Sequence, residues 1–181
     1  MKFYILLLAS FALIKSSFSA KCYHLKDNEV RELWDKWNQA ISSGIVDNIV
    51  HLYWDQSILI PTFSNHIRND NPTKYEYFEH LLMRKPSFHV KKDFTDTSGC
   101  NMAQYSGIYE LSITEPQSFA IAKFSVRFSY TYQTFDGKVW SIKTDHSSLM
   151  EDPLKSSSSN PNDEALPTFA PSKDLMNNDA P

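Results

Sequence analysis

The sequence predicts an α+β domain in which three N-terminal helices cover one face of a curved antiparallel sheet. Segments before residue 86 repeat apolar residues at helical spacing, whereas segments after residue 87 alternate apolar and polar residues, as strands do. Helices early in the chain and an antiparallel run of strands later are typical of helices packed on one sheet face. The chain of 181 residues is long enough for one such domain with its own core.

Three segments have helical character. A short helix is predicted over residues 47–53, and another begins at Asn71 and Pro72 and stops before Pro86, because proline favours a first helical turn and disfavours a helix just before it. The segment Ser57–Thr62 is expected to be a short edge strand, since its proline cannot donate to a neighbour. The first helix, over residues 28–44, has one apolar stripe that consists of Val30, Leu33, Trp34, Trp37, Ala40 and Ile41.

Long strands follow. Alternation over residues 88–94, 102–113 and 120–132 predicts three strands, and Asp136 with Gly137 supplies a hairpin turn before a last strand from Val139 to about Met150. One face of the central strands is rich in aromatic side chains, and the predicted helices are expected to bury it.

Both ends of the chain differ from the predicted domain at residues 21–152. Residues 1–20 have a signal peptide's proportions, with Lys2, an apolar run and a small, polar end, so we expect export to a secreted or periplasmic location and no stable membrane insertion after cleavage. The alternative is an uncleaved anchor. Residues 153–181 are rich in Ser, Pro, Asn and Asp and are predicted to be disordered.

Two cysteines, Cys22 and Cys100, remain after the predicted cleavage. An even count in an exported chain indicates one disulfide, which would tie the mature N-terminus to the start of a central strand. Two free thiols are the alternative.

Composition argues against several classes of function. The net charge of −3 offers no basic surplus for nucleic acid. The six histidines are scattered, without the paired spacing of zinc sites, so neither a metal nor a cofactor is expected.

The candidate site is an aromatic cavity between helix and sheet. Asp145 and His146 are adjacent and therefore face opposite ways unless a bulge intervenes, and His146 shares its parity with Trp140 and Ile142, which predicts that it points inward. Much apolar surface with few polar anchors suits a small, mostly apolar ligand, although the same rings could simply fill the core. The predicted cavity residues are Trp37, Tyr105, Tyr109, Phe128, Tyr130 and His146.

Two arginines are further candidates. Arg127 lies opposite the aromatic face, which favours a dimer interface over an anion site in the cavity. Arg68 lies in a polar turn, either at the cavity mouth or simply exposed.

Several strings in order resemble the nuclear transport factor 2-like superfamily, and within it the calcium/calmodulin-dependent protein kinase II association domain and its stand-alone SnoaL-like bacterial relatives. They are WNQAISSG, VDNIVHLYWDQSILIPTFSNHIR, YEYFEHLLMRKP, GCNMAQYSGIY and DGKVWSIKTDHSSLMED. The resemblance implies a cone-shaped fold, a homodimer formed through the sheet, and a cavity. Ser147, Gly107 and Tyr130 stand where the kinase's association domain has arginines, so its arginine-lined cavity is not expected.

We therefore expect an exported homodimer, with higher oligomers as an option, that has a cavity for a small ligand, no kinase activity and no strong catalytic machinery. Kinase motifs are missing from the sequence. One alternative is an enzyme of isomerase, dehydratase or cyclase type that uses His146 as the catalytic residue with tyrosine hydroxyls. The other is a purely structural dimerisation module.

Overall fold

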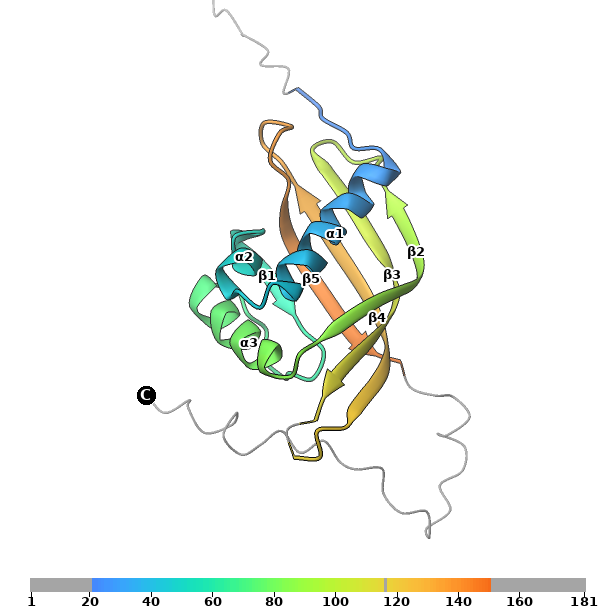
Figure 1. Ribbon diagram of the computed structural model, residues 1–181. Coiled ribbons are helices and arrows are strands. Elements are labelled where there is room, and N and C mark those ends of the chain that lie inside the picture. The colour runs from blue at the N-terminus through green and yellow to red at the C-terminus, as the bar shows by residue number, and fades with distance from the viewer. Residues whose placement is uncertain (1–20, 116, 151–181) are drawn as a thin grey trace, which may run out of the picture.

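The computed structural model describes residues 21–115 and 117–150 and has three helices and five strands. The predicted signal peptide and the predicted disordered tail lie outside these residues. The elements are α1 (Asp27–Ser42), α2 (Val46–Val50), β1 (Tyr53–Ile60), α3 (Asn71–Met83), β2 (Ser87–Asp96), β3 (Met102–Thr114), β4 (Ile121–Gln133) and β5 (Ser141–Leu149) (Figure 1).

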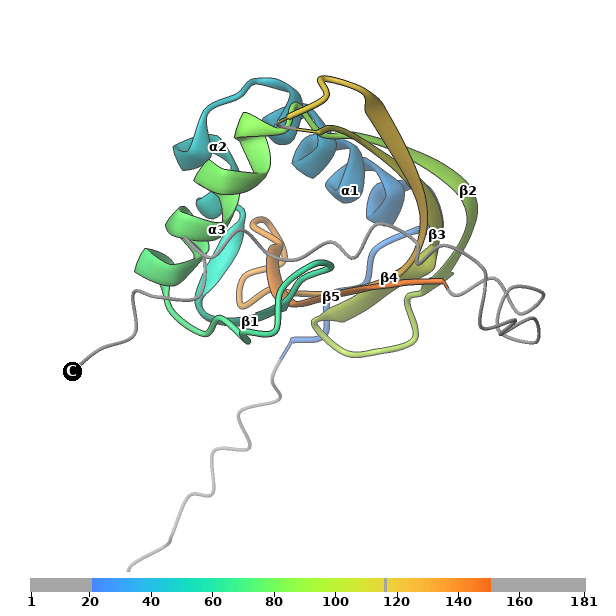
Figure 2. The same ribbon diagram turned by 90° about the horizontal axis from the view of Figure 1, so that it is seen from below.

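The five strands form one sheet in the order β1-β5-β4-β3-β2, and the helices cover only its inner face. Figure 2 shows the sheet curving around α1, with α2 and α3 beyond it. The α+β cone fold predicted from the sequence is confirmed. Strands β2 to β5 pair antiparallel, as expected, whereas β1 joins the edge of the sheet parallel to β5.

Element boundaries differ from the prediction where β1 begins. The short helix ends at Val50, not at residue 53, and β1 starts at Tyr53, not at Ser57. The backbone N–H of Ile142 in β5 donates to the carbonyl of Leu52 at 2.8 Å, so pairing with a distant strand extends β1 toward the helix. Helix propensity alone cannot anticipate a partner that lies so far along the chain.

The core lies between α1 and the inner face of the sheet. The buried stripe of α1 consists of Val30, Trp34, Trp37, Ala40 and Ile41, as its spacing predicted. The Trp34 ring lies 6.2 Å from that of Phe128 between centroids, and the Trp37 ring lies 5.0 Å from that of Phe88. Aromatic side chains of this size contribute most of the buried apolar surface in such a core.

The sheet bends at a bulge between Val90 and Lys92 of β2, opposite Ile108. Gly107 of β3 pairs with Asp93, next to this bulge, and a Cβ there would come within 2.1 Å of the Lys92 carbonyl oxygen. Only glycine permits so close an approach of two backbones.

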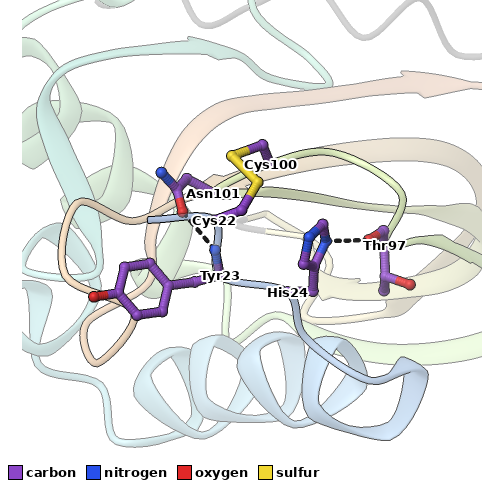
Figure 3. Close-up of a disulfide and its surroundings, with 6 residues drawn as sticks. All are labelled: Cys22, Tyr23, His24, Thr97, Cys100 and Asn101. Atoms are coloured by element: carbon purple, nitrogen blue, oxygen red, sulfur yellow. Dashed lines mark hydrogen bonds between the residues drawn. A yellow bond between two sulfur atoms is a disulfide. The ribbon is translucent and has the colours of Figure 1, made fainter. Parts of the chain in front are cut away.

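A disulfide joins Cys22 to Cys100 and so attaches the segment before α1 to the β2–β3 turn, as predicted (Figure 3). Around it, the Tyr23 N–H donates to Asn101 Oδ1 at 2.8 Å, and the Asn101 N–H donates to the Tyr23 carbonyl at 3.1 Å. A ring nitrogen of His24 lies 3.2 Å from the Thr97 carbonyl oxygen. The disulfide agrees with export, which itself stays a prediction.

Candidate functional site

A bulge in β5 turns Asp145 into the core. Thr131 pairs with Thr144 and Tyr132 pairs with Ile142, so Lys143 is the extra residue and the alternation reverses after it. Asp145 is only 3 % exposed. The expected inward orientation of His146 is wrong, because the same reversal places that side chain on the exposed face of the sheet.

The Asp145 carboxylate is held by hydroxyl groups from two strands. The Tyr53 hydroxyl, from β1, donates to Asp145 Oδ2 at 2.5 Å, and Tyr130, the cross-strand neighbour on β4, contributes a weaker hydrogen bond. Trp37 Nε1, from α1, donates to the Tyr53 hydroxyl at 3.0 Å. A chain of buried hydrogen bonds therefore joins α1, β1, β4 and β5 at one carboxylate.

Burial raises the pKa of Asp145 from its usual 3.8 to about 7, against the opposing effect of the Tyr53 and Tyr130 hydrogen bonds. Burial and the nearby Asp145 charge raise the pKa of both tyrosines well above 10, so both remain donors. A carboxyl that exchanges its proton near neutral pH beside fixed hydroxyl donors has the properties of a general acid or base.

A second hydroxyl cluster lies two residues further along β5. Both the backbone N–H and the hydroxyl of Thr62 donate to Ser147 Oγ at 2.9 Å. The Tyr109 hydroxyl also has hydrogen bonds with Ser147 and Thr62, and burial raises its pKa well above 10. The inner face of β5 thus presents two polar side chains, Asp145 and Ser147, to the tyrosines of β3 and β4.

Five of the six residues predicted to line the cavity come together in the core. Trp37, Tyr105, Tyr109, Phe128 and Tyr130 are all buried. Ring centroids of Phe128 lie 5.2 Å from Tyr105, 5.3 Å from Tyr109 and 6.0 Å from Tyr130. The sixth, His146, is absent from this group for the reason given above.

The two candidate arginines lie outside the core network. Arg68 braces the connection between β1 and α3: its Nη1 donates to Ser64 Oγ at 2.8 Å and its Nε to the Thr73 carbonyl at 3.0 Å. Partial burial lowers the pKa of Arg68. Arg127 is exposed on the outer sheet face, as its parity predicted, and its Nη2 donates to the Leu149 carbonyl at 3.3 Å.

Sequence reasoning missed Asp145 because strict alternation along β5 assigns its side chain to the outer face. The only signal of the bulge in the sequence is that two polar, titratable residues, Asp145 and His146, are adjacent in a predicted strand. Within the described part of the chain, no group of three His, Cys, Asp or Glu side chains could hold a metal ion. Among residues 21–115 and 117–150, no helix is long and apolar enough to cross a membrane.

Comparisons with known proteins agree with this architecture. The family model for the calcium/calmodulin dependent protein kinase II association domain matches residues 26–151. A protein from Xanthomonas campestris, provisionally described as such a domain, is 29 % identical, and the match covers 71 % of this chain and 90 % of that one with a TM-score of 0.66. No curated protein matches the chain.

More distant structures share the fold alone. A protein from Streptomyces avermitilis, provisionally described as a dehydratase of the nuclear transport factor 2-like family, is 8 % identical over 69 % of this chain and 97 % of that one, with a TM-score of 0.61. A ketosteroid isomerase-like protein from Erwinia carotovora atroseptica is 9 % identical over 68 % and 95 %, with a TM-score of 0.57. These matches place the chain in the cone-shaped α+β fold.

Proposed function

Because this chain belongs to the calcium/calmodulin dependent protein kinase II association domain family, we propose that it is an exported protein that assembles as a homodimer through the outer face of its sheet and holds a small, mostly apolar ligand inside. The observation that carries the proposal is that the matched region spans the described domain while all its helices lie on one side of the sheet. Within the described residues, no helix or strand covers the outer face.

The chemistry of the outer face suits a contact between two copies. On this face, Gln104 Nε2 lies 3.0 Å from Ser129 Oγ, and Ser106 Oγ lies 3.1 Å from the same atom, so short polar side chains form a hydrogen-bonded patch. Arg127 extends from this surface, and its guanidinium donates to the Leu149 carbonyl at 3.3 Å. A symmetric contact can give such a guanidinium further acceptors from the other copy.

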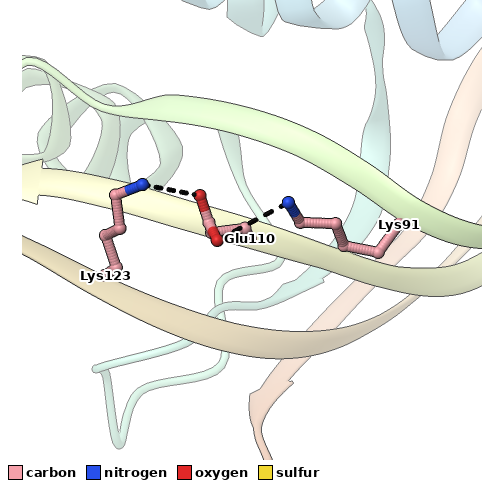
Figure 4. Close-up of polar contacts among 3 residues, drawn as sticks. All are labelled: Lys91, Glu110 and Lys123. Atoms are coloured by element: carbon pink, nitrogen blue, oxygen red, sulfur yellow. Dashed lines mark hydrogen bonds and ion pairs between the residues drawn. The ribbon is translucent and has the colours of Figure 1, made fainter.

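Charged groups on the same face are already paired within the chain. Glu110 lies between Lys123, at 3.1 Å, and Lys91, at 3.6 Å (Figure 4). Exposed pairs of this kind contribute little to stability, but they fix where charge lies on the face. Fixed charges of this kind affect the specificity of a contact between copies more than they affect its affinity.

Native mass spectrometry and light scattering test the assembly. We expect the wild-type protein to be a dimer or larger at micromolar concentration, and Arg127→Glu to shift it toward the monomer. Lys138→Glu reverses the same charge in the exposed β4–β5 loop and serves as the matched control. A monomeric wild-type protein, or equal effects of the two variants, would contradict assembly through this face.

Unpaired polar atoms in the core support an interior ligand. Trp34 Nε1 and the Tyr132 hydroxyl are buried without a hydrogen-bond partner, although buried polar groups are nearly always paired. An acceptor atom of a bound small molecule would satisfy either group. Native mass spectra recorded before and after organic extraction test this, since a bound molecule appears as a mass that extraction removes.

A second function, proton-transfer catalysis of isomerase or dehydratase type, is favoured by the Asp145 site. A carboxyl with a pKa of about 7 beside two tyrosine donors could remove and return a proton next to a carbonyl group. The residue that carries this function would be Asp145, in place of the histidine expected from the sequence. The descriptions of the Streptomyces and Erwinia proteins agree in reaction class only.

Deuterium exchange tests this second function without knowledge of the natural substrate. Cyclohexanone and a β,γ-unsaturated ketosteroid are incubated with the protein in D2O, and loss of α-protons is followed by NMR. Asp145→Asn should abolish exchange above the buffer rate, whereas His146→Asn should leave it unchanged. Exchange that survives Asp145→Asn would rule out this carboxyl as the base.

A further inference from the structure

We propose that a surface pocket between the start of β1 and the β4–β5 loop binds the sugar rings of an oligosaccharide. The pocket has a volume of about 460 Å³, which falls in the range of small-ligand sites. It lies on the edge strand and the β4–β5 loop and shares Tyr53 with the Asp145 network, but neither Asp145 nor any residue of β3 or β4 is part of its lining. Its lining consists of Tyr53, Trp54, Asp55, Phe135, Asp136, Val139 and Ser141.

The loop that forms one wall of the pocket is fixed by its own hydrogen bonds. Asp136 Oδ1 accepts from the backbone N–H groups of Lys138, at 2.8 Å, and Val139, at 3.0 Å. The hydroxyl of Thr134 accepts from the Gly137 N–H at 2.9 Å. Gly137 has a φ of 74°, which glycine adopts without strain. These bonds define one loop conformation.

The disulfide-linked N-terminal segment holds the same loop from outside. The Thr134 N–H donates to the Asn101 carbonyl at 3.1 Å, next to the disulfide at Cys100. The Tyr23 ring packs against Gly137 so closely that a Cβ there would come within 2.1 Å of it. Figure 3 shows Tyr23 and Asn101 beside the disulfide. The wall of the pocket is therefore preorganised, which lowers the entropic cost of binding.

This fixed loop nevertheless presents apolar side chains to solvent. Phe135 is 75 % exposed and Val139 is 67 % exposed. The Phe135 ring meets Trp54 nearly edge to face, with 4.3 Å between centroids. This pair of rings gives a sugar a large apolar surface. The C–H groups on one face of a sugar ring can pack against the electron-rich face of an aromatic ring.

Polar groups of both kinds surround the two rings. Asp55 and Asp136 are acceptors, and the backbone N–H bonds hold the pKa of Asp136 below its usual range, so it stays ionised. Lys143 is a donor, with its ammonium 5.7 Å from the centroid of the Trp54 ring. Sugar hydroxyls both donate and accept, so a neutral sugar can satisfy all three groups.

Other ligand classes fit this lining less well. The two carboxylates of Asp55 and Asp136 outnumber the one ammonium of Lys143, so the net negative charge of these groups disfavours an anion. A purely apolar peptide would remove these charges from water without replacing their hydrogen bonds. The mixture of an aromatic pair with acceptors and a donor favours a neutral polyol that has an apolar ring face.

The test uses the full mature chain with maltotriose, cellotriose and triacetylchitotriose as probes, followed by calorimetry and by amide and indole shifts in ¹H–¹⁵N spectra. We expect at least one of them to bind, with shifts at Trp54 and the loop, and Phe135→Ala to weaken binding about tenfold or more. Phe119→Ala, which removes an equally exposed ring at the β3–β4 turn, is the matched control and should have no effect.

Four outcomes would overturn the proposal. Three are no binding of any probe at about 10 mM, equal effects of the two variants, and sugar-induced shifts confined to other regions. The fourth is a change in oligomeric size caused by Phe135→Ala, which would identify the pocket as a protein contact. Phe135 is exposed, so its truncation should leave the fold intact, which circular dichroism checks.

Discussion

The substitution Asp145→Asn should change the pH dependence of stability. Asparagine keeps the shape of the side chain, and its amide oxygen can still accept from the Tyr53 hydroxyl. It cannot ionise. The comparison with the wild-type protein therefore isolates the free energy of placing a charge in this site.

The raised pKa of Asp145 gives the sign of the effect and its order of magnitude. Because burial raises the pKa of Asp145 from 3.8 to about 7, the folded protein keeps a proton that the unfolded chain loses between about pH 4 and pH 7. The free energy of unfolding therefore falls as pH rises through this window. One pKa unit corresponds to 1.36 kcal/mol, so the wild-type protein should lose about 4 kcal/mol relative to the variant across it.

Urea unfolding followed by tryptophan fluorescence at several pH values measures this difference. Asp70, Asp96 and Asp136 have pKa values lowered by hydrogen bonds, so their contributions are lost on acidification below about pH 4, outside the window. Asp35→Asn, at an exposed position of α1, is the control and should follow the wild-type curve. A constant difference between wild type and Asp145→Asn, or one of opposite sign, would refute the buried-carboxyl interpretation.

Three further changes test other parts of the structure. Tyr53→Phe removes the main hydrogen-bond donor to Asp145, so it should raise the pKa of that carboxyl further and destabilise the fold by about 1–3 kcal/mol. Carbon NMR of the aspartates measures the pKa. An unchanged titration of Asp145 would contradict the hydrogen bond. Replacing both Cys22 and Cys100 by serine removes a disulfide between residues that are 78 apart in the sequence. On the chain-entropy model this should lower the free energy of unfolding by about 4 kcal/mol and therefore lower the Tm. An unaltered Tm would mean that the disulfide hardly restricts the unfolded chain. Gly107→Ala should lower the free energy of unfolding by about 2 kcal/mol or more, because its Cβ would meet a β2 carbonyl oxygen at 2.1 Å, and full stability in urea would show that the bulge can shift.

Local patterns predicted most of the fold because each element has a clear period. The α1 stripe that contains Trp34 and Trp37 is buried as expected, and the aromatic face of β3 and β4 is inside. These patterns depend only on residues close together in the chain and on the need to bury apolar surface. The parallel pairing of β1 with β5 was not predictable in this way, because its partners lie about ninety residues apart along the sequence.

In the candidate site, too, local patterns predict some features and only the tertiary structure decides others. The sequence determined that Trp37, Tyr105, Tyr109, Phe128 and Tyr130 would meet in the core, since regular alternation and helical spacing place them there. Only the tertiary structure decided which side chain of the Asp145–His146 pair joins them. One extra residue, Lys143, reverses the alternation of β5, and the position of a bulge depends on pairing with β4, which no local pattern encodes.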